Sequence, residues 1–94
     1  MAKVTVRLYS LWQMYAGTET ARLEADSLAE ALNEIEDMFG AKLREGMKAK
    51  GIVLDGKIEE FSLVLLNGTN IKQVPDTALK DGDTIHIMPP LAGG

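Results

Sequence analysis

The segment SLAEALNEIEDMFG, residues 27–40, carries the clearest periodic pattern in the chain. Ser27 followed three residues later by Glu30 forms a capping box, which is a signature of a helix N-terminus. Gly40 is the expected end of that helix. Between these signals, apolar residues recur at helical spacing: Leu28, Ala31, Leu32, Ile35 and Phe39. The sequence therefore predicts one amphipathic helix over residues 28–39.

The two segments before this helix alternate apolar and polar residues with period two, which is typical of half-buried strands. They are residues 3–9 and 18–24, and we expect them to pair as a hairpin. The intervening residues 10–17 are predicted to form a loop, although this segment is unusually apolar. We expect Leu11 to pack on the core, whereas Trp12 suits the core and a partner surface equally well.

Residues 41–60, which follow the helix, have the weakest pattern. Residues 41–50 fit either a short second helix or an irregular loop, because two glycines interrupt the apolar spacing. The pair Asp55 and Gly56 favours a tight turn, so either a small hairpin or an excursion of the chain is expected over residues 52–58.

The C-terminal third predicts three further strand segments. Residues 62–67 form an apolar run that is typical of a central strand, and Asn67-Gly68 is the strongest hairpin-turn signal in the chain. A short return strand follows, and Leu79 is expected in the core. After the polar turn at residues 81–83, residues 84–88 alternate as the last strand.

This order of elements predicts an α+β fold of the β-grasp type, with a mixed sheet of about five strands crossed by one main helix. A hairpin, a helical crossover and a second hairpin leave few right-handed solutions, and the last strand is expected to be central and parallel to the first. Residues 1–94 are long enough for one domain and too short for two independent cores.

Composition narrows the possible functions. Ten basic and 14 acidic side chains give a net charge of −4, and no basic cluster with interleaved aromatics favours nucleic-acid binding. No apolar run is long enough for a membrane span and no signal peptide is recognisable, so a cytoplasmic protein is expected. With no cysteine and one histidine, the sequence predicts neither a metal site nor an active site of the usual enzyme classes.

The chain ends in MPPLAGG, residues 88–94, directly after the last predicted strand. Two prolines favour a stiff, extended path, and two glycines make a tip that can enter a narrow slot. The expected reactive group is the α-carboxylate of Gly94, and the expected channel-entering residues precede it: Pro89, Pro90, Leu91, Ala92 and Gly93. A carboxylate needs activation, most economically as an acyl-adenylate made by a partner that binds ATP. Attack by a sulfur donor then gives a thiocarboxylate, and attack by a lysine gives an isopeptide bond.

Residues 81–94 resemble the closing signature of the small subunit of molybdopterin synthase, within the MoaD/ThiS group of ubiquitin-like sulfur carriers. The resemblance implies a carrier without its own active site or bound cofactor. It implies that a ubiquitin-activating-like adenylyltransferase consumes ATP to adenylate Gly94, and that a sulfur donor, acting through a sulfurtransferase, converts Gly94 to a thiocarboxylate. The tail would then enter the large subunit of molybdopterin synthase, where its sulfur helps build the pterin dithiolene of the molybdenum or tungsten cofactor.

Candidate partner-surface residues are Met88 and His86 on the last strand, together with Trp12. Other carrier pathways stay open, namely thiamine thiazole, tRNA thiolation and cysteine synthesis, although thiazole carriers usually lack the double proline. Two other classes also remain: a ubiquitin-like modifier conjugated to lysines through Gly94, and a plain interaction module with an incidental tail.

Overall fold

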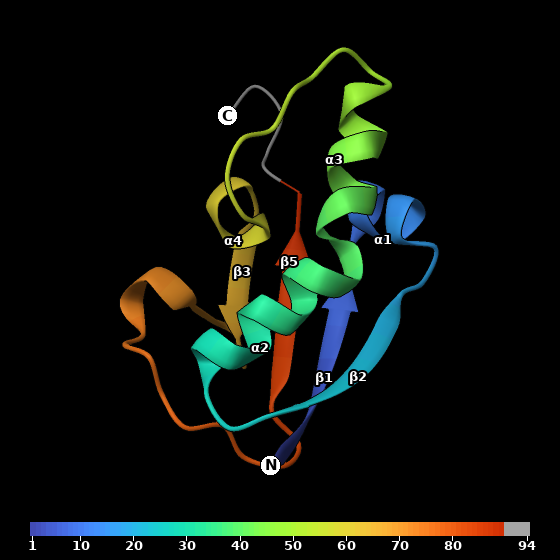
Figure 1. Cartoon of the computed structure of the whole chain (residues 1–94). Helices are drawn as coiled ribbons and strands as arrows, with labels where there is room; N and C mark the ends of the chain where they lie inside the picture. Colours follow the sequence, from blue (N-terminus) through green and yellow to red (C-terminus); the bar gives the residue numbers. More distant parts are fainter. Residues whose placement is uncertain (90–94) are drawn as a thin grey trace.

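The computed structural model describes residues 1–89, in which a long helix lies across a five-stranded mixed sheet (Figure 1). In chain order the elements are β1 (Ala2–Leu8), α1 (Ser10–Ala16), β2 (Thr20–Ala25), α2 (Leu28–Ile35), η1 (Glu36–Gly40), α3 (Ala41–Lys48), α4 (Ile58–Phe61), β3 (Leu63–Leu66), β4 (Thr69–Asn70), η2 (Ile71–Gln73) and β5 (Thr84–Met88). The strand order is β2-β1-β5-β3-β4, so the predicted β-grasp fold is confirmed.

The last strand occupies the middle of the sheet, as its alternating sequence predicts. β5 runs parallel to β1, with Val6 opposite Ile85, and antiparallel to β3, with Val64 opposite Ile87. These four side chains are at most 2% exposed and form the floor of the core beneath the helix. Because β1, β5 and β3 all turn alternate side chains inward, one face of the sheet is apolar and packed, and no helix within residues 1–89 covers the other.

The main helix begins where the sequence predicts and ends later. The Ser27 hydroxyl caps the helix by accepting a hydrogen bond from the Glu30 N–H (3.2 Å). The Glu30 carboxylate accepts one from the Asp26 N–H (3.2 Å) rather than from the Ser27 N–H, so only the Ser27 half of the predicted capping box is present. Gly40 does not end the helix: its φ and ψ are −51° and −48°, and the helical path continues through a π-helical turn, η1, into α3. The predicted stop at Gly40 is wrong, and the helix spans residues 28–48.

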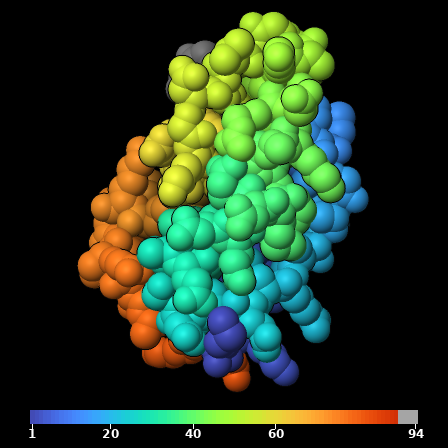
Figure 2. Space-filling view, in the orientation of Figure 1, coloured from blue at the N-terminus to red at the C-terminus, as the bar shows by residue number. Residues whose placement is uncertain are grey.

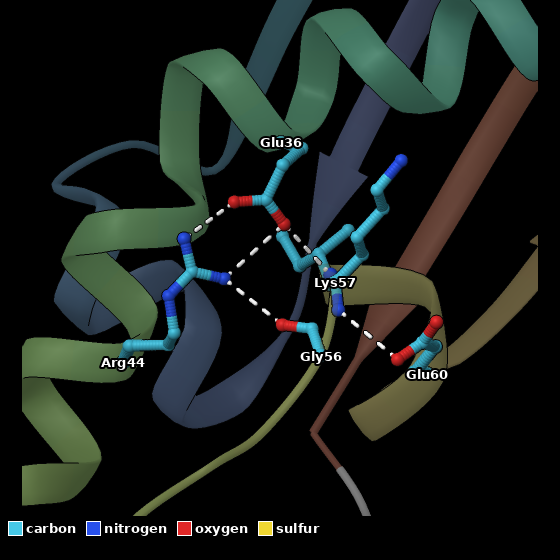
Figure 3. A network of polar contacts seen from close by, with 6 residues as sticks. Glu36, Arg44, Gly56, Lys57 and Glu60 are labelled. Atoms are coloured by element: carbon cyan, nitrogen blue, oxygen red, sulfur yellow. Dashed lines mark hydrogen bonds and ion pairs between the residues drawn. The ribbon is translucent and has the colours of Figure 1, made fainter.

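Gly40 serves a different purpose, which is to leave room for a carboxylate. A side-chain carbon at Gly40 would occupy the position of the Glu36 carboxyl group. That carboxylate accepts hydrogen bonds from both terminal nitrogens of Arg44 and from the Ile58 N–H (2.9 Å), and Arg44 also donates to the Gly56 carbonyl (3.2 Å) (Figure 3). The Arg44 guanidinium, opposed in part by burial and aided by the Ile58 bond, lowers the pKa of Glu36. This network ties the end of the loop before α4 to the long helix.

Replacing Gly40 with alanine is therefore expected to destabilise the fold by about 1 kcal/mol, although alanine in a free helix is better than glycine by about the same amount. The added methyl group must displace Glu36 from three donors, and partial loss of such charged hydrogen bonds outweighs the helix propensity. In a Glu36→Ala background the sign should reverse, and Gly40→Ala should then stabilise. Urea unfolding of the four proteins in this cycle measures both values; a stabilising Gly40→Ala in the wild-type background would contradict the explanation.

The predicted loop over residues 10–17 is wrong. Residues 10–16 form a helix, α1, which ends at Gly17 with a φ of 78° and a hydrogen bond from the Gly17 N–H to the Gln13 carbonyl. Of the two alternatives for residues 52–58, the excursion is correct and the hairpin is not, because this stretch contains no strand and leads into α4. Gly56 does adopt a φ of 86°, so the turn signal is real but connects to a helix.

Of the two alternatives for residues 41–50, the helical one is correct, and a close contact explains the glycine within it. A side-chain carbon at Gly46 would overlap the ring of Tyr15, so α1 packs directly against the α3 backbone. Viewed from the helix side, α2, α3 and the following segment cover the middle of the molecule (Figure 2). Within residues 1–89, no helix is both long and apolar enough to cross a membrane.

Candidate functional site

The candidate site is the point where the chain leaves the central strand β5. Met88 lies opposite Leu63 of β3, and the Ile87 carbonyl accepts a hydrogen bond from the Tyr9 N–H (3.1 Å), just beyond the end of β1. Pro89, the last described residue, is half-buried. Neighbouring chain segments on both sides thus fix the base from which the terminal residues begin. The predicted tail residues Pro90, Leu91, Ala92, Gly93 and Gly94 lie outside the described residues.

Side-chain hydrogen bonds also hold the start of β5. The Asp83 carboxylate accepts hydrogen bonds from the Lys80 N–H (2.8 Å) and from the Asn67 side-chain amide (3.0 Å), and these bonds lower its pKa. The side-chain oxygen Oδ1 of Asn67 in turn accepts from the Thr84 N–H (2.9 Å), which joins the β3–β4 turn to the first residue of β5. Asn67 and Gly68 have φ values of 51° and 94°, so the predicted hairpin turn is confirmed.

The lowered pKa of Asp83 predicts a pH-dependent contribution to stability. Because the folded-state pKa lies below the unfolded value, near 3.9, the contribution is full above that value and is lost as pH falls through the folded-state pKa. At neutral pH, Asp83→Asn is expected to lower the free energy of unfolding by about 1 kcal/mol, since the group is partly exposed. Urea unfolding between pH 7 and roughly 3 measures the difference.

The exposed Asp55 offers a matched control for this experiment. Asp55→Asn should have little effect at any pH, because surface substitutions away from such bonds are usually neutral. A wild-type advantage over Asp83→Asn that stays constant down to acid pH would contradict the assigned role of the carboxylate.

The uncovered face of the sheet beside the exit point carries a mixed apolar and aromatic patch. We define the sheet-face patch as Tyr9, Leu63, Leu65, His86 and Met88. The strand register places Met88 beside Leu63 and His86 beside Leu65, and Leu63 is 37% exposed. The Tyr9 hydroxyl lies 2.6 Å from His86 Nδ1, within hydrogen-bond distance, and their ring centroids are 5.8 Å apart. Two of the predicted surface residues, Met88 and His86, are therefore brought together here.

Trp12, the third predicted surface residue, lies elsewhere, and its assignment to a partner surface is wrong. Its side chain is fully buried in the core between the sheet and the helices, where its ring lies edge-on to Phe61 with the ring centroids 6.1 Å apart. The indole N–H donates to the Ser62 hydroxyl (2.8 Å), directly before β3. Trp12 therefore helps to position the strand beside the exit point. Leu11 is partly buried against the core, as predicted.

Sequence reasoning missed Tyr9, Leu63 and Leu65 as members of the patch. The available signal was the apolar run of residues 63–66, which places apolar side chains on both faces of β3. A single layer of helix covers only one face, so the outward members of that run remain at the surface. In the described part of the chain, no three His, Cys, Asp or Glu side chains are grouped to hold a metal ion.

A family model described as the ThiS family matches residues 12–94 of this chain. A search of curated proteins gave no match. Among solved structures, the chain is similar to small archaeal modifier protein 1 from Methanosarcina acetivorans, at 32% identity with a TM-score of 0.71, covering 100% of this chain and 98% of the other.

Two similar structures contain more than one protein. One is a complex of subunits 1 and 2 of the molybdopterin-converting factor from Helicobacter pylori, with 27% identity, a TM-score of 0.58, and coverage of 98% of this chain and 99% of the matched chain. The other is the BexX/CysO complex from Amycolatopsis orientalis, with 26% identity, a TM-score of 0.62, and coverage of 97% and 99%. Relatives of this fold thus occur in complexes.

Proposed function

Since the chain belongs to the ThiS family, we propose that it carries sulfur on the α-carboxylate of Gly94 as the small subunit of a molybdopterin synthase. The observation that supports this proposal is the fixed end of the central strand from which the tail sequence continues. The sequence PPLAGG follows directly on the central strand, whose last residues are held by Leu63 on one side and by Tyr9 on the other. Because the end of β5 is fixed, the number of residues after it would set how far Gly94 can extend into a partner.

The proposed chemistry needs two steps on the carboxyl group of Gly94. First, a carboxylate oxygen of Gly94 attacks the α-phosphorus of ATP held by an adenylyltransferase, which releases pyrophosphate and leaves an acyl-adenylate. Second, a hydrosulfide ion supplied through a sulfurtransferase attacks the acyl carbon. AMP departs with the electron pair of the acyl–oxygen bond, the sulfur loses its proton to solvent, and a thiocarboxylate remains. In this scheme the chain itself supplies recognition and reach, and its partners supply the ATP site and the sulfur.

The molybdopterin pathway is the finer part of the proposal. It is supported by the double proline before LAGG and by similarity to the Helicobacter pylori complex of converting-factor subunits. The thiocarboxylate would enter the large subunit of molybdopterin synthase in the cytoplasm and give its sulfur to the pterin. Deleting the tail tests the chemistry, whereas identifying the partner tests the pathway.

The sheet-face patch is proposed as the docking surface that brings the tail to its partners. Exposed apolar side chains beside aromatic ones are typical of interface anchors. Leu63→Lys is therefore expected to weaken binding to the large subunit by about tenfold, because a buried apolar contact is replaced by a desolvated charge. Titration calorimetry with the purified large subunit measures the change in Kd.

Val53→Lys is the matched control for Leu63→Lys, since Val53 is 75% exposed and lies in the loop before α4 rather than on the sheet. The control should bind like the wild type. Equal losses for the two variants, or none for Leu63→Lys, would remove the patch from the interface.

A second candidate function is protein modification through Gly94. It is favoured by the 32% identity to a protein named as a small archaeal modifier over essentially the whole chain. Both functions share the acyl-adenylate and differ in the nucleophile that follows, which is sulfur for a carrier and a lysine amine for a modifier.

The experiment that separates them is recovery of the N-terminally tagged chain, with its C-terminus free, from its native cells. Co-purification of a molybdopterin synthase large subunit supports the proposed pathway. Recovery of many proteins joined to Gly94 through lysine supports the modifier function, and recovery of a thiazole synthase assigns a different sulfur pathway.

A further inference from the structure

The edge strand β2 is a surface that the proposed carrier chemistry does not use. In the described sheet β2 pairs only with β1, so its outer side has no neighbouring strand. In an antiparallel pair, the backbone groups of successive residues point alternately toward and away from the neighbouring strand. The hydrogen bond from the Leu8 N–H to the Glu19 carbonyl (2.9 Å) shows that Glu19 points toward β1, and so do alternate residues of β2 after it. Arg22 and Glu24 are the residues between these, so their backbone N–H and C=O groups point outward, away from β1. These groups can pair with another strand.

The side chains of this edge are complementary to themselves. Arg22 and Glu24 are both exposed and point to the uncovered face, as their partners Thr5 and Lys3 on β1 do. When two β2 strands meet antiparallel with Leu23 on the two-fold axis, Arg22 of each copy faces Glu24 of the other. In this register both positions also have their backbone groups directed toward the second strand.

The two registers closest to this one that preserve the backbone bonds are unfavourable. A shift that puts Arg22 on the axis brings two arginines together, and a shift that puts Glu24 there brings two glutamates together. Like charges directly opposite each other destabilise a strand pair, whereas opposite charges stabilise it. Charged side chains often protect an edge strand from random pairing, and here the same charges favour the register with Leu23 on the axis over the two like-charged ones.

Apolar side chains flank this edge on the helix side. Leu23 shares a shallow hollow with Met1 and Met38, and these methionines are 73% and 40% exposed. With Leu23 on the axis, the hollows of two copies would adjoin. Glu34 and Asp37 line the same hollow, and their charges oppose a tight association. A weak dimer that forms at high protein concentration is therefore the expected product.

We propose that this chain forms a symmetric homodimer by antiparallel pairing of β2 with β2 of a second copy, in the register that opposes Arg22 and Glu24. The inference goes beyond the proposed carrier function, because β1 separates β2 from the strand that bears the tail. The antiparallel arrangement directs the exit points of the two copies to opposite ends of a continuous sheet. Each copy keeps its own route to a partner.

The test uses charge reversal and mixing of full-length variants, followed by sedimentation equilibrium over a dilution series. Arg22→Glu alone and Glu24→Arg alone should each weaken self-association by about tenfold or more, because each places like charges opposite one another twice. An equimolar mixture of the two variants should regain a one-to-one dimer, and the double variant should dimerise like the wild type. Circular dichroism checks that each exposed substitution leaves the fold intact.

Lys72→Glu, an exposed charge reversal outside β2, is the matched control and should leave the association unchanged. A wild-type chain that stays monomeric at every concentration would overturn the proposal. A dimer that neither single variant weakens, or single variants that fail to associate when mixed, would overturn it as well. None of these measurements depends on sulfur loading, so the proposed function stands or falls separately.

Discussion

A chain that lacks Gly93 and Gly94 is expected to fold normally and to transfer no measurable sulfur. The deletion moves the terminal carboxylate back by two residues, which is about 7 Å in an extended chain. It also leaves Ala92, with a side chain, at the tip. Because a misplacement of about 1 Å can cost on the order of 100-fold in rate, the loss should be at least that large. A reconstituted transfer assay with the activating enzyme, sulfur donor and large subunit measures it.

The fold of the truncated chain provides the internal control, because the core lies within residues 1–89. Urea unfolding should give the same midpoint for the truncated and the complete chain. Gly94→Ala, which keeps the length of the tail, separates the effect of reach from that of bulk at the tip. A truncated chain with undiminished transfer would show that Gly94 is not the carrying residue.

Trp12→Ala is expected to be the most destabilising of the single substitutions considered, with a loss of about 3–5 kcal/mol in the free energy of unfolding. The side chain is fully buried, meets Phe61 edge-on and donates a hydrogen bond to Ser62. Its removal leaves a cavity beside Phe61 and takes away the hydrogen-bond donor to the Ser62 hydroxyl. Urea unfolding measures the effect.

Trp12→Phe separates packing from hydrogen bonding at this position. It keeps most of the ring contact and loses the donor to Ser62, so the expected loss is smaller, about 1–2 kcal/mol. If Trp12→Ala left the stability unchanged but abolished partner binding, the side chain would be an interface anchor after all, and its core assignment would fail.

The sequence was sufficient to predict the parts of the fold that depend on periodicity and turns. The alternation of residues 84–88 and the Asn67-Gly68 turn place β5 and the second hairpin, and the capping box at Ser27 places the start of the long helix. These signals are local, because each lies within the residues of the element that it predicts.

The incorrect predictions share a physical cause, which is contact between distant segments. Helix α1 has no side-chain cap at its start, and it packs against the long helix where Gly46 admits the ring of Tyr15. Gly40 alone is typical of a helix end. In the structure it makes room for the Glu36 carboxylate, which accepts a hydrogen bond from the Ile58 N–H, 22 residues along the chain from Glu36. A periodic pattern does not contain such contacts.

The candidate site was predictable only in part for a similar reason. Met88 and His86 could be placed on the last strand and on its outward face from alternation alone. Leu63 and Leu65 could not be assigned to that face, because an apolar run on both sides of a strand is also typical of a fully covered one. Only the observed single helical layer shows which side stays open. The functional prediction for Gly94 concerns chemistry rather than placement, and it remains a prediction.

The most direct test of the carrier proposal is the mass of the terminal peptide of the N-terminally tagged chain, isolated from its native cells. Cleavage after Lys80, the last lysine or arginine in the chain, yields residues 81–94. A thiocarboxylate should add about 16 Da, and fragment ions should place the gain on Gly94 and not on Met88, whose oxidation gives the same nominal shift. Alkylation of the terminal sulfur should confirm the position. A terminus found only as the free carboxylate, with any added mass confined to Met88, would contradict the proposal.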